Sequence, residues 1–154
     1  MIIEPLNILL ADDDTDDCLF FKKALEDLPI STHLTTVQDG EQLMTYLSEN
    51  LVPLPDALFL DLNMPRKNGF ECLCEIKDDE KLKDILVVMF SISYPRDPNY
   101  EQDMINRLLG IGAHHFIRKA NDLDQLKQSI QLALTMAVEK KSLKEFSKIL
   151  KKSA

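Results

Sequence analysis

The chain follows the apolar run LNILLA, at residues 6–11, immediately with the acidic run DDD, at residues 12–14. A short apolar run of this kind is typical of a strand buried in a protein core. In sheets of the α/β class, the carboxyl ends of the strands form the edge at which ligands bind. This stretch therefore predicts a buried first strand whose acidic end lies at a binding edge.

Further along the chain, short apolar runs alternate with longer amphipathic stretches. The apolar runs predict strands at residues 6–11, 57–60, 85–90 and 115–117, and residues 34–37 predict a further, more polar strand. The amphipathic stretches predict helices over residues 15–28, 41–49, about ten residues after Gly69, 100–110 and 122–152. Five strands that alternate with five helices predict an α/β fold, with a parallel sheet, right-handed crossovers and helices on both faces.

Length and composition suit one globular domain. The chain has 154 residues, of which 45% are hydrophobic and 29% are charged. No apolar run reaches the roughly 18 residues that a membrane span needs, and no basic region precedes the first apolar residues as it would in a signal peptide. We therefore expect a cytoplasmic protein in which Cys18, Cys72 and Cys74 are reduced packing residues.

Charge is distributed unevenly along the chain. The net charge is −8, but residues 139–154 contain six Lys and two Glu, which leaves −12 on the preceding 138 residues. An acidic body argues against nucleic acid as the main partner. We expect a domain over residues 5–138 and a basic amphipathic extension of the last helix over residues 139–154.

Polar residues follow four of the five predicted strands. The residues that close the first, third, fourth and fifth strands are Asp12-Asp13-Asp14, Asp61, Ser91 and Lys119. Carboxylates gathered at one edge repel each other, which raises their pKa values or requires a cation. An open site with oxygen ligands suits Mg²⁺. A carboxylate beside such an ion is a competent nucleophile towards phosphorus, while Lys and Ser supply positive charge and a hydroxyl donor to phosphoryl oxygens.

These residues make the chain similar to a known family. Over about residues 5–138 it resembles the response-regulator receiver domain of two-component systems. Four segments carry the resemblance in the expected order: ILLADDD at 8–14, FLDLNMP at 59–65 with Gly69, MFS at 89–91 and FIRK at 116–119. The resemblance implies a doubly wound, five-stranded parallel sheet of the (βα)5 flavodoxin-like or CheY-like kind, with strand order 2-1-3-4-5 and, here, an extended C-terminal helix.

The resemblance also implies roles for individual residues. Asp61 becomes the phosphoacceptor, and Ser91 and Lys119 become the residues that contact the phosphoryl group. Ser91 and Phe116 become a switch pair, in which the aromatic ring turns inward when Ser91 moves. The implied readout is a change in the surface formed by the fourth helix, the fifth strand and the fifth helix.

A metal site is implied at the same edge. Asp12, Asp13, Asp61 and the backbone carbonyl of Asn63 become ligands of Mg²⁺, with Asp13 a more direct ligand than Asp12. Mn²⁺ is a substitute for Mg²⁺ at such a site.

The chain departs from the family pattern in three places. Ala120 follows Lys119 where the family has Pro in a cis peptide bond, so the Lys119–Ala120 bond is either trans or strained. Ile92 follows Ser91 where the family prefers a small residue, and we expect it to narrow access to the phosphoryl group or hold the loop in one state. The segment between Ser91 and Phe116, including residues 92–100, is longer than in a minimal receiver.

The acidic run also permits plainer interpretations. Asp16 and Asp17 are expected to act only at the start of the helix, as caps or as charges that oppose the helix dipole. Asp14 suits either that role or the metal. A calcium-binding loop is excluded, because Asp17 stands where such a loop needs Gly and Lys23 where it needs Glu.

The function expected from these features is phosphorelay signal transduction in the cytoplasm. A histidine kinase or histidine phosphotransfer protein would supply the phosphoryl group, and output would be contact with an unknown downstream protein. We expect no direct DNA binding and no membrane contact. The protein would not be an enzyme beyond Mg²⁺-dependent self-phosphorylation from phosphodonors and autodephosphorylation.

Two other functions stay open. A pseudo-receiver would keep the fold as a binding module without a phosphoryl cycle, and only Ala120 and Ile92 favour it. A phosphatase of the haloacid-dehalogenase kind also uses an Asp nucleophile. Its motif needs Thr or Val at the fifth position, where this chain has Asp16 or Pro65.

The end of the chain has its own pattern. Leu143, Phe146, Ile149 and Leu150 recur at helical spacing, with Lys on the other faces. This segment either lies along its own domain or forms a contact with a partner, including a second copy in a homodimer. Binding of a membrane or nucleic acid by the lysines is a further alternative.

Overall fold

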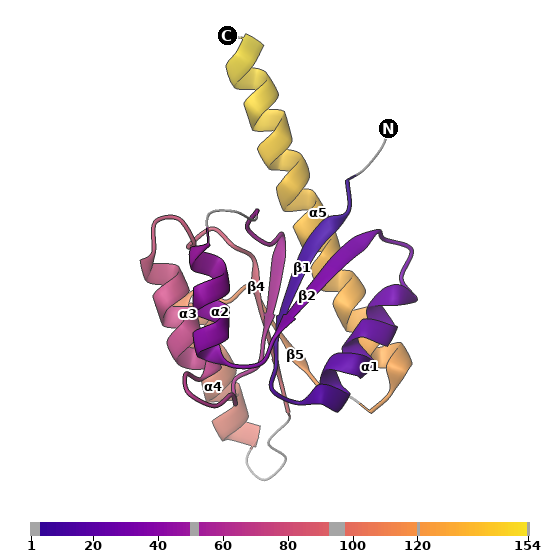
Figure 1. Cartoon of the computed structure of the whole chain (residues 1–154), viewed down its shortest axis with the longest axis vertical. Coiled ribbons are helices and arrows are strands. Elements are labelled where there is room, and N and C mark those ends of the chain that lie inside the picture. Colours follow the sequence, from indigo (N-terminus) through magenta and orange to yellow (C-terminus); the bar gives the residue numbers. More distant parts are fainter. Residues whose placement is uncertain (1–3, 50–52, 93–97, 120, 154) are drawn as a thin grey trace.

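The computed structural model describes residues 4–49, 53–92, 98–119 and 121–153, and shows a sheet covered by helices on both faces (Figure 1). The strands are β1 (Leu6–Ala11), β2 (Thr32–Val37), β3 (Ala57–Leu60), β4 (Val87–Ser91) and β5 (His115–Arg118). The helices are α1 (Thr15–Glu26), α2 (Gly40–Ser48), α3 (Gly69–Asp78), α4 (Pro98–Ile111) and α5 (Leu123–Ser153). The strands are parallel in the order β2-β1-β3-β4-β5, so the predicted fold class and strand order are confirmed.

Two apolar layers hold the helices against the sheet. On one face, α1 and α5 pack against side chains that include Ile8, Leu10 and Phe59. On the other face, α2, α3 and α4 pack against side chains that include Leu9 and Leu58. Because successive side chains of a strand point to opposite faces, a central strand supplies both layers and is mostly apolar.

Three strands differ from their predicted bounds, and the smallest difference is that β5 ends one residue later, at Arg118. Thr32 pairs with Leu6, so β2 extends along the whole of β1 and begins two residues earlier than predicted. The N–H of Ile85 donates to the carbonyl of Leu82 at 3.0 Å, which makes residues 82–85 a turn, and β4 begins only at Val87.

Three helices begin with a capping side chain at the carboxyl edge of the sheet. The capping residues are Asp14, Asp39 and Asn68, and each accepts a hydrogen bond from the backbone N–H three residues further on. Asp14 therefore takes the capping role, which is one of the two that the sequence left open.

Gly69 allows α3 to begin directly against the end of β3. A Cβ atom at this position would lie 2.1 Å from the carbonyl oxygen of Asp61. The N–H of Gly69 also donates to the carbonyl of Leu62 at 2.9 Å. Only glycine leaves room for this approach, and the contact fixes the backbone that carries Asp61.

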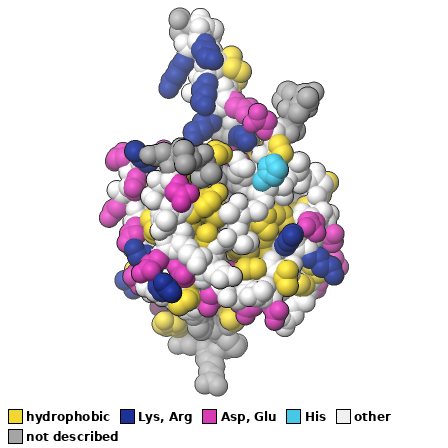
Figure 2. All heavy atoms as spheres, in the orientation of Figure 1, with side chains coloured by type: hydrophobic (Ala, Val, Ile, Leu, Met, Phe, Trp, Pro, Cys, Tyr) yellow, Lys and Arg dark blue, Asp and Glu magenta, His cyan; other side chains and the backbone are white. Residues whose placement is uncertain are grey.

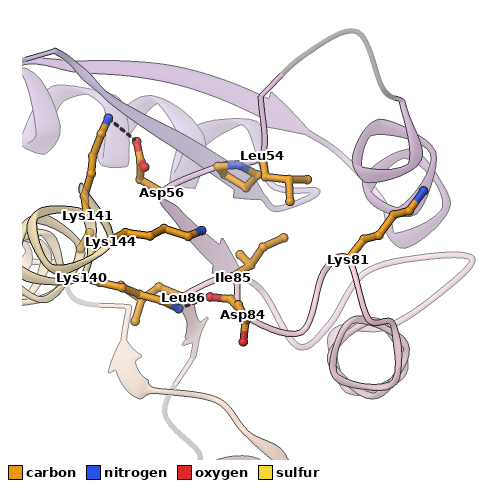
Figure 3. A pocket seen from close by; sticks show the side chains of 11 residues that line it. Leu54, Asp56, Lys81, Asp84, Ile85, Leu86, Lys140, Lys141 and Lys144 are labelled. Carbon is orange, nitrogen blue, oxygen red and sulfur yellow. Dashed lines mark hydrogen bonds and ion pairs between the residues drawn. The ribbon is translucent and has the colours of Figure 1, made fainter. Parts of the chain in front are cut away.

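The last helix continues beyond the body of the domain. Lys140 donates to the carbonyl of Asp84, and the ammonium of Lys141 lies 3.5 Å from the carboxylate of Asp56 (Figure 3). Residues 142–153, here called the tail, are all exposed and project away from the sheet (Figure 1). The interpretation in which this segment lies along its own domain is therefore wrong. None of the described helices combines the length and apolar composition that a membrane crossing requires.

Candidate functional site

Asp61 is the first residue after β3 and lies inside the fold. Its side chain is 4% exposed, and its N–H donates to the carbonyl of Ala11 at 2.9 Å. That bond ties the end of β3 to the end of β1, where Asp12 follows. Parallel pairing of the two strands therefore brings Asp12 and Asp61 to the same edge of the sheet.

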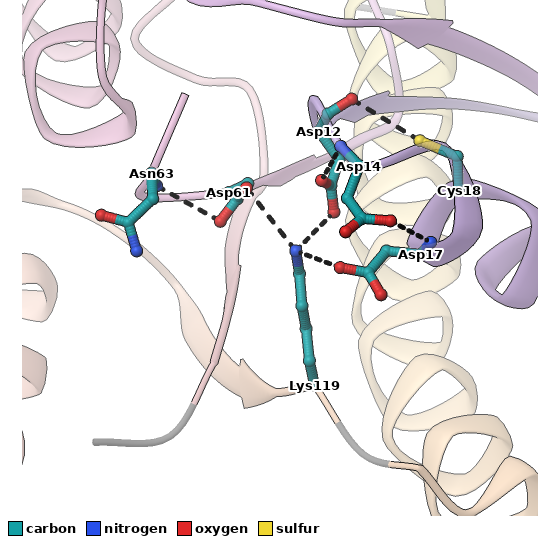
Figure 4. A network of polar contacts seen from close by, with 7 residues as sticks. All are labelled: Asp12, Asp14, Asp17, Cys18, Asp61, Asn63 and Lys119. Carbon is teal, nitrogen blue, oxygen red and sulfur yellow. Dashed lines mark hydrogen bonds and ion pairs between the residues drawn. The ribbon is translucent and has the colours of Figure 1, made fainter. Parts of the chain in front are cut away.

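Lys119 follows β5 and reaches across this edge to the carboxylates (Figure 4). Its ammonium nitrogen lies 2.8 Å from Oδ2 of Asp12, 2.8 Å from Oδ2 of Asp17 and 3.5 Å from Oδ2 of Asp61. The backbone supports this reach, because the N–H of Lys119 donates to the carbonyl of Ser91 at 2.8 Å. Lys119, which follows β5, thus contacts one residue that follows β1, one that follows β3 and one in α1.

Three carboxylates form a group of the size that holds a cation. Oxygens of Asp12, Asp13 and Asp61 lie within 4.8 Å of one another. Asp12 and Asp61 are buried, whereas Asp13 is exposed, so the group is open to solvent on one side. Hard oxygen donors with a hydrated side suit Mg²⁺ or Mn²⁺. The residues present therefore fit a divalent cation.

Burial governs the ionisation of this group. Desolvation raises the pKa of Asp61 to about 7, and the charges of Asp12 and Asp13 add to the rise, which Lys119 only partly offsets. Burial likewise raises the pKa of Asp12. For Lys119, burial lowers the pKa, but hydrogen bonds to Asp12 and Asp17 outweigh it and raise the pKa overall. One lysine therefore does not neutralise the negative charge of the site.

Ser91 and Asn63 also lie at this edge. The side chain of Ser91 is buried, and its Oγ has no hydrogen-bond partner among the described residues. A buried hydroxyl without a partner is costly, so a ligand oxygen near it would find a ready donor. The N–H of Asn63 donates to Oδ1 of Asp61 at 3.3 Å, which places the Asn63 backbone beside the phosphoacceptor position.

The predicted switch residue lies within a strand, not after its carboxyl end. Phe116 is in β5, is partly buried, and packs against the apolar layer beneath α2, α3 and α4. Ile92 is 59% exposed. The Lys119–Ala120 bond and residues 93–97 of the predicted loop lie outside the described part of the chain.

Sequence reasoning missed the contact of Asp17. It gave Asp17 only a role at the start of α1, yet its carboxylate is one of the two nearest partners of Lys119. No pattern in the sequence signals this contact, because it depends on where α1 starts in three dimensions. Asp17 belongs to the first turn of α1, and α1 begins directly after the acidic end of β1, so side chains of that turn can face the site.

The three cysteines agree with a packing role. Cys18, Cys72 and Cys74 are free thiols. Burial raises the pKa of Cys18 to about 11 and that of Cys72 to about 12. Thiols with such values are protonated at neutral pH and poor nucleophiles.

Comparisons with known proteins identify the family. A family model described as "Response regulator receiver domain" matches residues 8–131. The response regulator Rcp1 of Synechocystis sp. is 35% identical over 97 residues, which are 60% of this chain and 66% of Rcp1. The nitrate/nitrite response regulator NarL of Escherichia coli (strain K12) is 33% identical over 130 residues, which are 84% of this chain and 55% of NarL. The match thus spans about half of NarL and just under two thirds of Rcp1.

Solved structures give the same result. The phosphorylated cyanobacterial phytochrome response regulator RcpA has a TM-score of 0.71 at 33% identity, with 82% of this chain and 89% of that chain covered. The Mn²⁺-bound form of Rcp1 has a TM-score of 0.70 at 29% identity, with 82% of this chain and 90% of that chain covered. The chain belongs to the response regulator receiver domain family.

Proposed function

We propose that Asp61 accepts a phosphoryl group from a histidine kinase or a histidine phosphotransfer protein. The chain is a receiver domain of phosphorelay signalling, and the proposal assigns its chemistry to particular residues. The observation that carries it is the position of Asp61, which is buried at the end of β3 and lies 3.5 Å from the ammonium of Lys119.

The transfer we propose is a direct displacement at phosphorus. A carboxylate oxygen of Asp61 attacks, the bond between phosphorus and the donor's histidine nitrogen breaks, and that nitrogen keeps the electron pair. Lys119 offers positive charge to the phosphoryl oxygens, and the hydroxyl of Ser91, which has no partner among the described residues, offers a hydrogen bond. Water later hydrolyses the acyl phosphate. The activity that we propose is limited to self-phosphorylation from phosphodonors and autodephosphorylation.

A divalent cation is part of the proposal. Asp12, Asp13, Asp61 and the backbone carbonyl of Asn63 would hold Mg²⁺, or Mn²⁺ in its place. When bound, the cation would supply the positive charge that Lys119 alone does not provide. The support for this is the spacing of the three carboxylates and the raised pKa of Asp61.

Labelling with acetyl phosphate and Mg²⁺ tests the proposal. We expect wild type to gain one phosphoryl group, seen by intact mass, and Asp61→Asn to gain none. Asp56→Asn is a matched control, because Asp56 directly precedes β3 while Asp61 directly follows it, and we expect it to label normally. Unlabelled wild type, together with no beryllofluoride-dependent change in the amide spectrum near Ser91, would support the pseudo-receiver instead. Turnover of an aryl phosphate would support the phosphatase.

We further propose that output is a protein contact and that the tail is part of it. Leu143, Phe146, Ile149 and Leu150 are each more than half exposed, although side chains of this size are usually buried. Figure 2 shows basic side chains gathered on the same projecting end of α5. An exposed apolar stripe of this kind is a typical sign of an interaction surface.

The rotation of α5 separates this stripe from the domain. A helix turns by about 100° per residue, so Leu143, Phe146 and Leu150 lie roughly opposite the face of α5 that is buried at Ala133 and Ala137. The lysines of the tail instead continue the buried face. The stripe therefore points away from the body, on the side where Leu132 is also exposed.

A second copy of this chain is the occupant that we propose for the stripe. The lysines Lys144, Lys148 and Lys151 lie on the far side of the helix, so two tails can bring their stripes together without bringing these charges together. Spacings of three and four residues, as between Leu143, Phe146 and Leu150, suit pairing of two helices. Pairing the same surface on both copies gives a closed homodimer.

Sedimentation of the full chain tests the dimer. We expect a concentration-dependent dimer for wild type and a monomer for the double variant Phe146→Ser, Leu150→Ser. The control is Lys144→Ser, Lys148→Ser on the opposite face, which should still dimerise. Monomeric wild type at every concentration would overturn the dimer, and tail-dependent binding to anionic vesicles would favour a membrane contact. The downstream protein and the cytoplasmic location stay predictions.

A further inference from the structure

We propose that Asp17 restrains Lys119 in the unphosphorylated protein and must release it when Asp61 carries a phosphoryl group. Asp17 would thus be a positioning residue that acts through Lys119 and opposes the phosphorylated state. This inference rests on the proposed function, because it assumes that a phosphoryl group is added to Asp61.

The first argument is the number of donors that Lys119 has. A lysine ammonium carries three N–H groups and no acceptor. Three carboxylates surround it, with Asp12 and Asp17 at 2.8 Å and Asp61 at 3.5 Å (Figure 4). The two nearest oxygens, both at 2.8 Å, belong to Asp12 and Asp17, and Nζ donates a hydrogen bond to Oδ2 of Asp17. A phosphoryl oxygen that approaches Lys119 as closely therefore competes with these two carboxylates.

The second argument is which carboxylate can leave. Asp12 is fully buried, and its Oδ1 accepts from the N–H of Asp14 at 2.9 Å, so its side chain is held in place. Asp61 is the residue that carries the phosphoryl group. The side chain of Asp17, in contrast, is 35% exposed. It can turn to water at small cost, because a partly exposed ion pair contributes little stability.

The third argument is the location of Asp17 on a fixed helix. Its N–H donates to the capping carboxylate of Asp14 at 3.0 Å, which holds the backbone while the side chain remains free to rotate. Phosphorylation therefore need not move α1. The exchange requires only that the Asp17 carboxylate separates from Lys119 while a phosphoryl oxygen takes its place.

Asp16 provides a matched control for this proposal. It occupies the same first turn of α1 and carries the same charge, but it is exposed and has no ion pair among the described residues. Asp16→Asn and Asp17→Asn each remove one negative charge from the first turn of α1. Only Asp17→Asn also removes an ion pair with Lys119.

The experiment is a titration with beryllofluoride, a mimic of the phosphoryl group, at saturating Mg²⁺, followed by amide NMR. We expect Asp17→Asn to bind about two- to five-fold more tightly than wild type, the factor that a partly exposed ion pair represents. We expect Asp16→Asn to bind like wild type and Asp17→Glu to restore part of the restraint. In wild type, the side-chain carboxyl ¹³C signal of Asp17 should shift on binding. Unfolding temperatures check that each variant is folded.

The possible outcomes separate this inference from the proposed function. Wild type that neither binds beryllofluoride nor labels on Asp61 would remove the proposed function itself. If wild type binds, equal affinities for Asp17→Asn and Asp16→Asn would overturn the restraint alone. Weaker binding by Asp17→Asn would also overturn it, since Asp17 would then assist the phosphorylated state.

Discussion

The ammonium nitrogen of Lys119 lies 3.5 Å from a carboxylate oxygen of Asp61, although β4 lies between the strands that carry the two residues. The contact is possible because both residues directly follow their strands and the lysine side chain is long enough to pass the end of β4. It places a positive charge beside the proposed phosphoacceptor and links the end of β5 to the end of β3.

Replacing Lys119 by Met should weaken both folding and phosphorylation. Without the ammonium, the buried carboxylates Asp12 and Asp61 lose the cation that they share. We expect the free energy of unfolding at pH 8 without divalent cations to fall by roughly 3 kcal/mol. Labelling by acetyl phosphate should slow by at least about tenfold. Urea denaturation and intact mass measure the two effects, and a variant that labels at the wild-type rate would contradict the role of Lys119.

Asp61 should make stability depend on pH. Its folded-state pKa is raised from 3.8 to about 7, so the folded protein binds this proton more tightly than the unfolded chain does. Stability should therefore fall as the pH rises from about 4 to about 7. Asp61→Asn has no carboxyl group at this position, so its stability should not fall in this way. We expect it to be about 2–4 kcal/mol more stable than wild type at pH 8 in EDTA.

The same comparison at pH 5 is the control for Asp61→Asn. Wild type is then largely protonated at this position, so the difference between the two proteins should shrink. Adding Mg²⁺ at pH 8 should also reduce it, because a cation favours the ionised carboxylate of wild type. Equal stability of the two proteins at both pH values would show that the buried carboxyl group of Asp61 does not lower the stability of the protein.

Ser91→Ala should weaken the phosphorylated state without weakening the fold. The buried Oγ of Ser91 has no hydrogen-bond partner in the described part of the chain, so removing it should leave stability unchanged or raise it by up to about 1 kcal/mol. Beryllofluoride affinity should fall, because the phosphoryl oxygens lose a donor. Ser91→Thr keeps the hydroxyl and serves as the control. A marked loss of stability in Ser91→Ala would mean that the hydroxyl already has a structural partner.

Two glycines give opposite predictions for the same substitution. Gly69→Ala places a methyl group 2.1 Å from the carbonyl of Asp61 and should destabilise the protein by about 2 kcal/mol or more while displacing the site. Gly110→Ala has no atom within 4 Å of the new methyl group and lies inside α4. It should stabilise the protein by about 0.5–1 kcal/mol. Thermal unfolding of both variants, with Mg²⁺-dependent labelling of Gly69→Ala, tests this contrast.

The sequence alone determined the fold class and the residues that the sheet brings together. Central strands buried on both faces leave short, mostly apolar runs, so β1 and β3 were predicted with their observed bounds. The residues after those runs are close in space because parallel strands share one carboxyl edge. Asp12, Asp61, Ser91 and Lys119 are therefore local features of the sequence that need only the strand order to form one site.

Tertiary structure alone decided the contacts that depend on how a helix is rotated. Helical spacing shows which side chains share a face of α1 or α5, but packing decides where that face points. Asp17 faces Lys119 because α1 starts at the acidic end of β1. Leu143 and Phe146 are exposed because α5 continues past the body of the domain, and the packing of α5 at Ala133 and Ala137 turns their face away from it. Helical spacing predicts that an apolar stripe exists, whereas only the tertiary structure decides whether the rest of the domain covers that stripe.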